Sequence, residues 1–273
     1  MSADPAPAWW RAAATRVAEL PAPWCTEPYL LGEHALATVV SAWGTGTALV
    51  AIVDGLGRER GLFGVGRAED VAAVLESITR GDELVRLDAR YATITRGAVE
   101  LLAPGVRDAV GLGGAESSWD WMWTDGPLQI PDHARAERLP LGPGTTDEVR
   151  EFLSRGHPTA STAPDDPRLI GWWGVREGGI LHAAVGAIQL APGMAPHLVS
   201  LGVDPGVRGR GLAGQVLAAA VEDCLRVHPV HGPSSVSLGL YADNDVARRV
   251  YLRLGFELRH GFTSRRLDRP SSG

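Results

Sequence analysis

The chain has 273 residues, of which 45% are hydrophobic and 21% charged, so it can form one large domain or two modest ones with buried cores. No run reaches the roughly 20 apolar residues that a membrane span requires. The formal net charge of −6 argues against general nucleic-acid binding, which needs a basic face, but leaves room for a local basic pocket that holds an anionic cofactor.

The two cysteines, Cys25 and Cys224, lie far apart and form no metal-ligand spacing, so we expect no metal. Cys224 falls on the apolar face of a predicted helix, which favours a buried thiol over a nucleophile. The N-terminal stretch carries an early Asp4 and lacks the apolar core of a signal peptide. We therefore expect a cytoplasmic protein that does not bind membranes.

The first half of the chain predicts a mixture of helices and strands. Residue spacing and turn signals predict helices over 9–20 and 68–79 and strands over 36–43, 47–53 and 119–123. In the last of these strands, Trp119, Trp121 and Trp123 occupy alternate positions and share one face. Core packing is the favoured interpretation of this stripe, and a platform for an adenine or an aromatic substrate is the alternative.

The second half gives clearer signals. Thr145 and Glu148 have the spacing of a capping box that opens a helix ending at Arg155. Further strands are predicted over 169–175, 180–190, 197–204, 236–240 and 257–267, and further helices over 211–227 and 245–254.

The segment 124–143 is rich in proline, glycine and charge, and is interpreted as a linker or a crossing strand. We place a boundary near Gln129, which gives domains at 1–128 and 129–273. The order of elements predicts a mixed α/β (α+β) fold.

A glycine-rich loop with two arginines, Arg208-Gly-Arg-Gly211, follows one predicted strand and precedes the helix predicted over 211–227. The first amide groups of a helix lack internal partners and lie at the positive end of its dipole, so such a loop suits a phosphate. Gly209 and Gly211 would let the backbone come close to that phosphate. On the glycines alone, an ordinary turn with solvated arginines is the favoured interpretation.

Two motifs, in a fixed order along the chain, favour a phosphate-binding loop over an ordinary turn. Arg208-Gly-Arg-Gly-Leu-Ala213 matches R/Q-x-x-G-x-G/A, and residues 244–256 match N-x-x-A-x-x-x-Y-x-x-x-G-F. With the strand and helix around them, residues 135–268 resemble the GNAT superfamily of N-acetyltransferases. The resemblance implies a GNAT fold, with a mixed, mostly antiparallel central sheet flanked by helices.

The glycine-containing segments 62–67 and 110–114 lack the first motif, and we interpret both as turns. The chain is thus similar to GNAT proteins with a degenerate N-terminal half, such as those related to glycine N-acyltransferase. This resemblance implies an α+β GNAT-like N-terminal half that supports a single active site.

The resemblance also assigns binding roles for acetyl-CoA. Backbone groups of one strand would pair with the pantetheine arm, the glycine loop would hold the pyrophosphate, and Asn244 would hydrogen-bond the pantetheine or serve as a helix N-cap. The implied cofactor-binding residues are Leu201, Gly202, Val203, Arg208, Gly209, Arg210, Gly211, Leu212, Ala213, Gly214 and Asn244.

Tyr251 stands where the family places the general acid that protonates the departing thiolate. Its phenol, with a pKa near 10, suits that role, and core packing is the alternative. The general base is where this sequence departs from the family, because many relatives carry a glutamate at the position of Gly239. Candidates elsewhere are Glu177, His182, His197 and Tyr241, or water.

We therefore expect an N-acetyltransferase that moves an acetyl group from acetyl-CoA to a primary amine by direct attack in a ternary complex. No cysteine is placed for a covalent acyl-enzyme. The acceptor is expected to be a small molecule or a peptide, and a homodimer stays open. The alternative is a catalytically silent acyl-CoA-binding regulatory module, which the glycine at position 239 leaves open.

Overall fold

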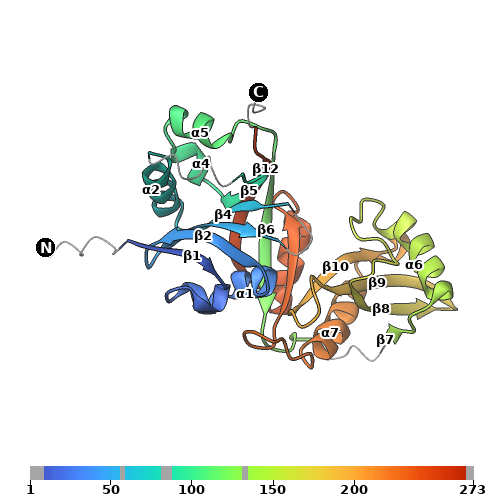
Figure 1. Ribbon diagram of the computed structural model, residues 1–273. Coiled ribbons are helices and arrows are strands. Elements are labelled where there is room, and N and C mark those ends of the chain that lie inside the picture. The colour runs from blue at the N-terminus through green and yellow to red at the C-terminus, as the bar shows by residue number, and fades with distance from the viewer. Residues whose placement is uncertain (1–8, 56–58, 81–87, 131–134, 269–273) are drawn as a thin grey trace, which may run out of the picture. The chain divides into compact units, whose positions relative to one another are not determined.

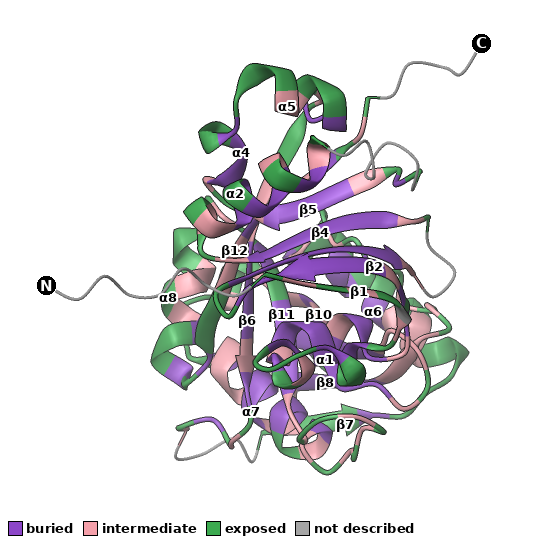
Figure 2. Ribbon diagram, turned by 60° about the vertical axis from the view of Figure 1, so that its left-hand side comes forward, coloured by how far each residue is buried: buried purple, intermediate pink, exposed green. Residues whose placement is uncertain are grey.

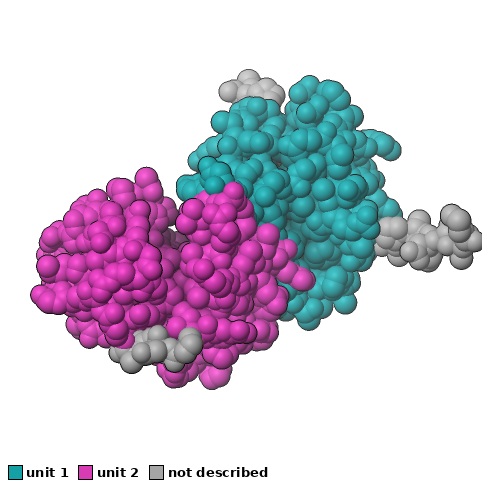
Figure 3. All heavy atoms as spheres, turned by 180° about the vertical axis from the view of Figure 1, so that it is seen from behind, with its two compact units in different colours: residues 1–120, 241–243, 260–273 teal, residues 121–240, 244–259 magenta. Residues whose placement is uncertain are grey.

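The computed structural model describes residues 9–55, 59–80, 88–130 and 135–268 (Figure 1). Buried residues concentrate on the strands, while the helices expose one side to solvent (Figure 2). The chain divides into two compact units (Figure 3). Unit 1 comprises residues 1–120, 241–243 and 260–273, and unit 2 comprises residues 121–240 and 244–259.

Unit 1 is built on a mostly antiparallel sheet. Its strand order is β1-β2-β3-β4-β5-β12, in which only β4 and β5 run parallel. The strands are β1 (Trp10–Thr15), β2 (Thr38–Gly44), β3 (Ala48–Asp54), β4 (Gly61–Gly66), β5 (Tyr91–Thr95) and the C-terminal part of β12 (Glu257–Arg266).

The last strand of the chain completes this N-terminal sheet. Residues 262–266 of β12 pair antiparallel with residues 91–95 of β5, so segments about 170 positions apart share one ladder. The hydroxyls of Thr93 and Ser264 lie 2.8 Å apart across the pair. Unit 1 is therefore built from both ends of the chain.

The helices of unit 1 are α1 (Pro28–His34), α2 (Ala68–Thr79), α4 (Ala98–Leu101) and α5 (Pro104–Val110), with 3-10 turns η1 (Val17–Glu19) and η2 (Trp24–Thr26). Helix α2 has the predicted bounds and buries its apolar face in the core of the unit. The buried members of that face are Val71, Ala72, Val74, Leu75 and Ile78.

In unit 2 the sheet strands are hydrogen-bonded in the order β11-β10-β9-β8-β7. Its strands are β7 (Ala136–Leu139), β8 (Leu169–Glu177), β9 (Ile180–Gln189), β10 (Pro196–Val203) and β11 (Val236–Tyr241), and β6 (Glu116–Thr124) runs from unit 1 into unit 2. All neighbours in this sheet are antiparallel except β10 and β11, which are parallel.

The parallel pair β10–β11 separates early. Only His197–Ser237 and Leu198–Leu238 are paired, whereas the antiparallel pairing of β10 with β9 continues to Val203. The β9 pairing shifts register between Val199 and Gly202, and Ser200 in this bulge has a φ of 55°. Beyond Leu198, the edge of β10 that faces β11 therefore has no strand partner among the residues that the structure describes.

Three helices cover the two faces of this sheet. Helices α7 (Leu212–Cys224) and α8 (Asp245–Leu254) share one core cluster with Trp173, and α6 (Pro143–Gly156) shares another with Trp172. The two tryptophans are neighbours on β8 and so point to opposite faces. The predicted apolar face of α7 is buried, and Cys224 is 1% exposed as expected.

Three local predictions are wrong. The segment predicted as a helix over 9–20 forms β1 and η1, because Trp10–Thr15 pairs with β2 and this long-range ladder overrides a weak helical signal. The segment 62–67, interpreted as a turn, lies mostly in the buried strand β4. Gly64 there allows close packing, since a Cβ would lie 2.8 Å from Val71 of α2.

The capping box at Thr145 is also wrong. Helix α6 begins two residues earlier with Pro143 in its first turn, a position where a proline loses no hydrogen bond. Its N-cap is Gly142, without a side-chain bond. The Glu148 carboxylate instead accepts hydrogen bonds from the Arg176 guanidinium on β8, at 2.8 and 2.6 Å.

The predicted fold class, a mixed α/β chain with mainly antiparallel sheets flanked by helices, is confirmed. The division into domains at 1–128 and 129–273 stays a prediction, and β6 crosses the observed limit between the units. Within β6, Trp121 is buried, as core packing requires. Trp119 is half-buried and donates a hydrogen bond from Nε1 to Ser264 Oγ at 2.8 Å.

We predict that Phe152→Ala lowers the free energy of unfolding by about 3–5 kcal/mol, because the side chain of Phe152, on α6, is fully buried against β10. Urea unfolding followed by tryptophan fluorescence measures the change. Leu252→Ala, on the exposed side of α8, is the control and should stay within about 0.5 kcal/mol. A loss below about 1 kcal/mol for Phe152→Ala would contradict the packing described.

Candidate active site

The loop before α7 leaves the helix N-terminus open. Gly211 is the N-cap, with a φ of 77° and no side chain to bond the first amides, and Gly209 has a φ of 80°. Nothing lies within 4 Å of a Cβ built on either glycine. The amides of Leu212, Ala213 and Gly214 in the first helical turn have no partner within the helix. The loop thus offers uncapped donors and space for an anion.

Gly202 and Gly214, the other two glycines in the predicted set, lie where there is little room for a side chain. At Gly214, a Cβ would lie 2.8 Å from Cδ1 of Ile130, and at Gly202 it would lie 3.1 Å from the ring of Phe152. Both are therefore required by close packing of neighbouring elements. The amide of Gly214 remains in the open first turn of α7.

The two arginines of the loop have different partners. Arg208 is exposed and donates from Nε to the carbonyl oxygen of Val203 at 3.2 Å, which holds its side chain beside the end of β10. Arg210 forms a two-pronged ion pair with Glu177, in which Nη2–Oε1 is 2.8 Å and Nη1–Oε2 is 3.1 Å. The same carboxylate also accepts a hydrogen bond from Arg135.

These two guanidinium groups, Arg135 first and then Arg210, lower the pKa of Glu177 below its usual value. A carboxylate held ionised in this way is a weak proton acceptor. Glu177 is therefore a poor candidate for the general base, although the sequence places it among the candidates.

Leu201 and Val203 lie on the part of β10 that has left β11. Both side chains are half-buried and pack against the α7 core. Their backbone edge on the β11 side is available to an extended ligand that pairs with it like an added strand. Arg208 already uses the carbonyl of Val203, so a ligand would share or replace that contact.

Asn244 is the N-cap of α8, and its Oδ1 accepts a hydrogen bond from the amide of Ala247 at 3.1 Å. The N-cap interpretation is confirmed. Because the cap uses only Oδ1, the Nδ2 amide keeps its capacity to donate. A contact from that group to pantetheine stays a prediction.

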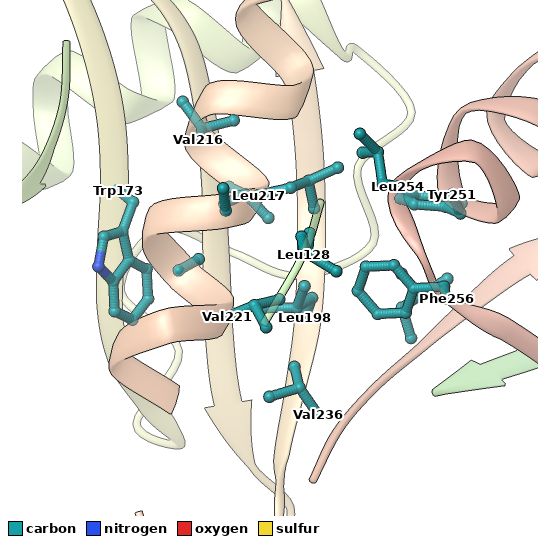
Figure 4. Packing of buried hydrophobic residues seen from close by; sticks show 14 of the residues in the cluster. Leu128, Trp173, Leu198, Val216, Leu217, Val221, Val236, Tyr251, Leu254 and Phe256 are labelled. Atoms are coloured by element: carbon teal, nitrogen blue, oxygen red, sulfur yellow. The ribbon is translucent and has the colours of Figure 1, made fainter. Parts of the chain in front are cut away.

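Tyr251 is 8% exposed and packs edge-on against Phe256, with ring centroids 5.7 Å apart (Figure 4). Core packing, the alternative considered for this residue, is thus present. Burial raises the pKa of Tyr251 to about 12, so its phenol is protonated at neutral pH. A protonated phenol can donate a proton, and a general acid role stays a prediction.

The other predicted base candidates differ in their surroundings. His197 Nδ1 lies 2.9 Å from the hydroxyl of Ser237. His182 Nδ1 is buried without a hydrogen bond, 3.5 Å from the nearest carboxylate oxygen of Asp204. Tyr241 is 65% exposed and belongs to the segment assigned to unit 1.

A histidine that the sequence did not single out lies beside β10. His157 follows α6, and its Cβ is 3.3 Å from the position of a Cβ on Gly202. Its buried Nδ1 has no hydrogen-bond partner in the described part of the chain. An imidazole nitrogen enclosed without a partner is uncommon and calls for an explanation. No local motif marks it, because only the packing of α6 against β10 brings it there.

Within the described part of the chain, no three histidine, cysteine or acidic side chains come together in a group that could hold a metal ion. The helices of that part include none long and apolar enough to cross a membrane. Burial raises the pKa of the Cys224 thiol to about 12, so this thiol is unreactive at neutral pH.

Comparisons with known proteins address the family. Three solved structures are similar in part: a protein described as a GNAT acetyltransferase from Novosphingobium aromaticivorans, a GCN5-related N-acetyltransferase from Kribbella flavida, and a tandem GNAT protein from the clavulanic acid biosynthesis pathway. Their identities are 21%, 17% and 15%, and their TM-scores 0.49, 0.48 and 0.41. They cover 79%, 83% and 86% of this chain and 90%, 88% and 84% of their own.

No curated protein matches the chain. The likeness to proteins related to glycine N-acyltransferase stays a prediction. The family model described as "Acetyltransferase (GNAT) family" matches residues 119–256, half of the chain, and includes the glycine loop, Asn244 and Tyr251. The chain therefore belongs to the acetyltransferase (GNAT) family.

Proposed function

We propose that this protein transfers an acetyl group from acetyl-CoA to a primary amine, by direct attack in a ternary complex in the cytoplasm. Membership of the GNAT family supports acyl-CoA-dependent acetyl transfer in general. The observation that carries the finer proposal is the uncapped N-terminus of α7 beside the unpaired end of β10. The acceptor would be an amine on a small molecule or a peptide.

Acetyl-CoA fits the donors of this site. Its diphosphate would accept hydrogen bonds from the open amides of residues 209–214, where the dipole of α7 favours negative charge. Its pantetheine arm would extend along the free edge of β10 at Leu201 and Val203, and the Nδ2 of Asn244 would donate to it.

The reaction needs one proton given and one removed. The amine lone pair forms the new C–N bond to the acetyl carbon while the C–S bond breaks, and Tyr251 would protonate the sulfur that leaves. The raised pKa of Tyr251 keeps this proton on the phenol at neutral pH, so the residue is in the protonated form that a general acid needs.

For the proton lost by the amine, we propose His157 in place of the candidates read from the sequence. Its Nδ1 is unpartnered and lies on a residue that packs against Gly202, next to Leu201. Glu177 is already committed to two arginines. A neutral imidazole accepts a proton readily, which suits this role.

The first experiment measures thiol release when acetyl-CoA and a panel of primary amines are added, together with thermal stabilisation by CoA. Thiol release that depends on an amine supports the transferase. Stabilisation by CoA without turnover on any amine would favour the silent binding module. Absence of both effects would contradict acyl-CoA binding altogether.

We predict that Gly211→Asp weakens CoA binding about tenfold, because the new carboxylate would stand at the open amides and repel the diphosphate. Isothermal titration with CoA measures the affinity. Gly97→Asp is the matched control, since Gly97 is also an N-cap with positive φ, in unit 1, and should leave CoA affinity unchanged. Equal affinity in both variants would contradict the proposed cradle.

We predict that Tyr251→Phe lowers kcat by at least about 100-fold, the usual minimum contribution of a general acid, with CoA affinity kept. The apolar surroundings of the ring tolerate phenylalanine, so the fold should be retained. Steady-state kinetics and CoA titration together test this. Unchanged turnover would refute the role of Tyr251.

We predict that His157→Gln lowers kcat/KM for the amine by at least about 100-fold, the usual minimum contribution of a general base, with CoA affinity kept. Steady-state kinetics with one amine and titration with CoA measure the two quantities. His228→Gln, which alters an exposed histidine, serves as the control. Wild-type kcat/KM in His157→Gln would exclude His157 as the base.

A further inference from the structure

We propose that Arg135 and Arg210 form a second phosphate site for acyl-CoA, and that Glu177 fills this site and must leave it when the phosphate binds. This inference rests on the proposed function. It adds a competitor built into the chain, which lowers cofactor affinity.

The geometry is that of an anion held between two guanidinium groups. Both oxygens of Glu177 are engaged by Arg210, at 2.8 and 3.1 Å, and Oε1 also accepts from Arg135. This planar, two-pronged arrangement is the one with which arginine binds phosphate as well as carboxylate. Glu177 therefore takes the place that a phosphate oxygen pair would take.

The site adjoins the glycine loop. Arg210 immediately precedes Gly211, the N-cap of α7. Glu177 is the last residue of β8. The next strand, β9, is joined to the segment that leads into the glycine loop, because the amide of Asp204 donates a hydrogen bond to the carbonyl oxygen of His182 at 2.8 Å. A ligand with one phosphate on the α7 amides could thus present another phosphate to the arginine pair.

The charges leave the site ready for an anion. Two guanidinium groups face one carboxylate, which gives a surplus positive charge beside the positive end of the α7 dipole. On the same strand, Arg176 has the opposite balance, because Glu137 and Glu148 share its single guanidinium. The Arg176 cluster has no positive charge to offer.

The contact is also easily exchanged. The side chains of Arg135 and Arg210 are 47% and 48% exposed, so their pairing with Glu177 is in contact with water and contributes little to stability. Glu177 precedes two glycines, Gly178 and Gly179, with φ of 58° and 82°. Glu177 can therefore be released at small cost when a more highly charged phosphate arrives.

The first test is Glu177→Gln, with CoA affinity measured by isothermal titration at low salt. We expect binding about fivefold tighter than wild type, because the competing charge is gone, and a smaller gain at high salt. Glu137→Gln is the matched control, which removes the same charge from the neighbouring Arg176 cluster and should leave CoA affinity unchanged.

Unchanged or weaker CoA binding in Glu177→Gln would overturn this inference, since it would mean that Glu177 is neutral or positions Arg210 for the ligand. The proposed function is tested separately by the wild type. Failure of the wild type to bind CoA refutes the proposed function, whereas normal wild-type binding with no gain in the variant refutes only the competitor.

The second test identifies the phosphate. Arg135→Gln is titrated with CoA and with 3′-dephospho-CoA, and we expect weaker binding of CoA. A loss confined to CoA assigns the arginine pair to the 3′-phosphate, and an equal loss with both ligands assigns it to the diphosphate. No loss with either ligand would overturn the site.

Discussion

The early end of the parallel pairing between β10 and β11 is the constraint from which the site follows. Pairing stops at Leu198 and Leu238, while β9 holds the other edge of β10 in register to Val203. One edge of β10 is thereby fixed and the other left open. The loop that leaves this strand then delivers Gly211 to the start of α7 with its amides uncapped. A rigid strand edge and a helix N-terminus thus lie in direct succession along the chain.

The glycines in and near this segment are required for two different physical reasons. Gly202 of β10 packs against Phe152 of α6, and Gly214 of α7 packs against Ile130, so a Cβ at either position would require its neighbour to move. Gly209 and Gly211, by contrast, face open space and are needed for their backbone conformation. The four glycines therefore fall into two groups, one required by packing and one by the conformation of the loop before α7.

The sequence predicts most of unit 2 because its elements carry strong local patterns. Residue spacing predicts the apolar face of α7, the cap at Asn244 and the strands from 169 to 203. Strand β1 was missed because alanine-rich segments have no strong preference, and only its ladder with β2 decides the outcome. Contacts between distant residues, such as Arg210 with Glu177 or His157 with Gly202, leave no trace in local spacing.

The pairing of β12 with β5 sets an order for folding during synthesis. Residues 262–266 are synthesised about 170 positions after residues 91–95, so the ladder between β5 and β12 forms only after the intervening segment has been made. During that time the edge of β5 at Tyr91–Thr95 is unpaired, and an open edge of this kind invites pairing with other chains. Unit 1 can thus be completed only after most of unit 2, residues 121–240 and 244–259, has been synthesised.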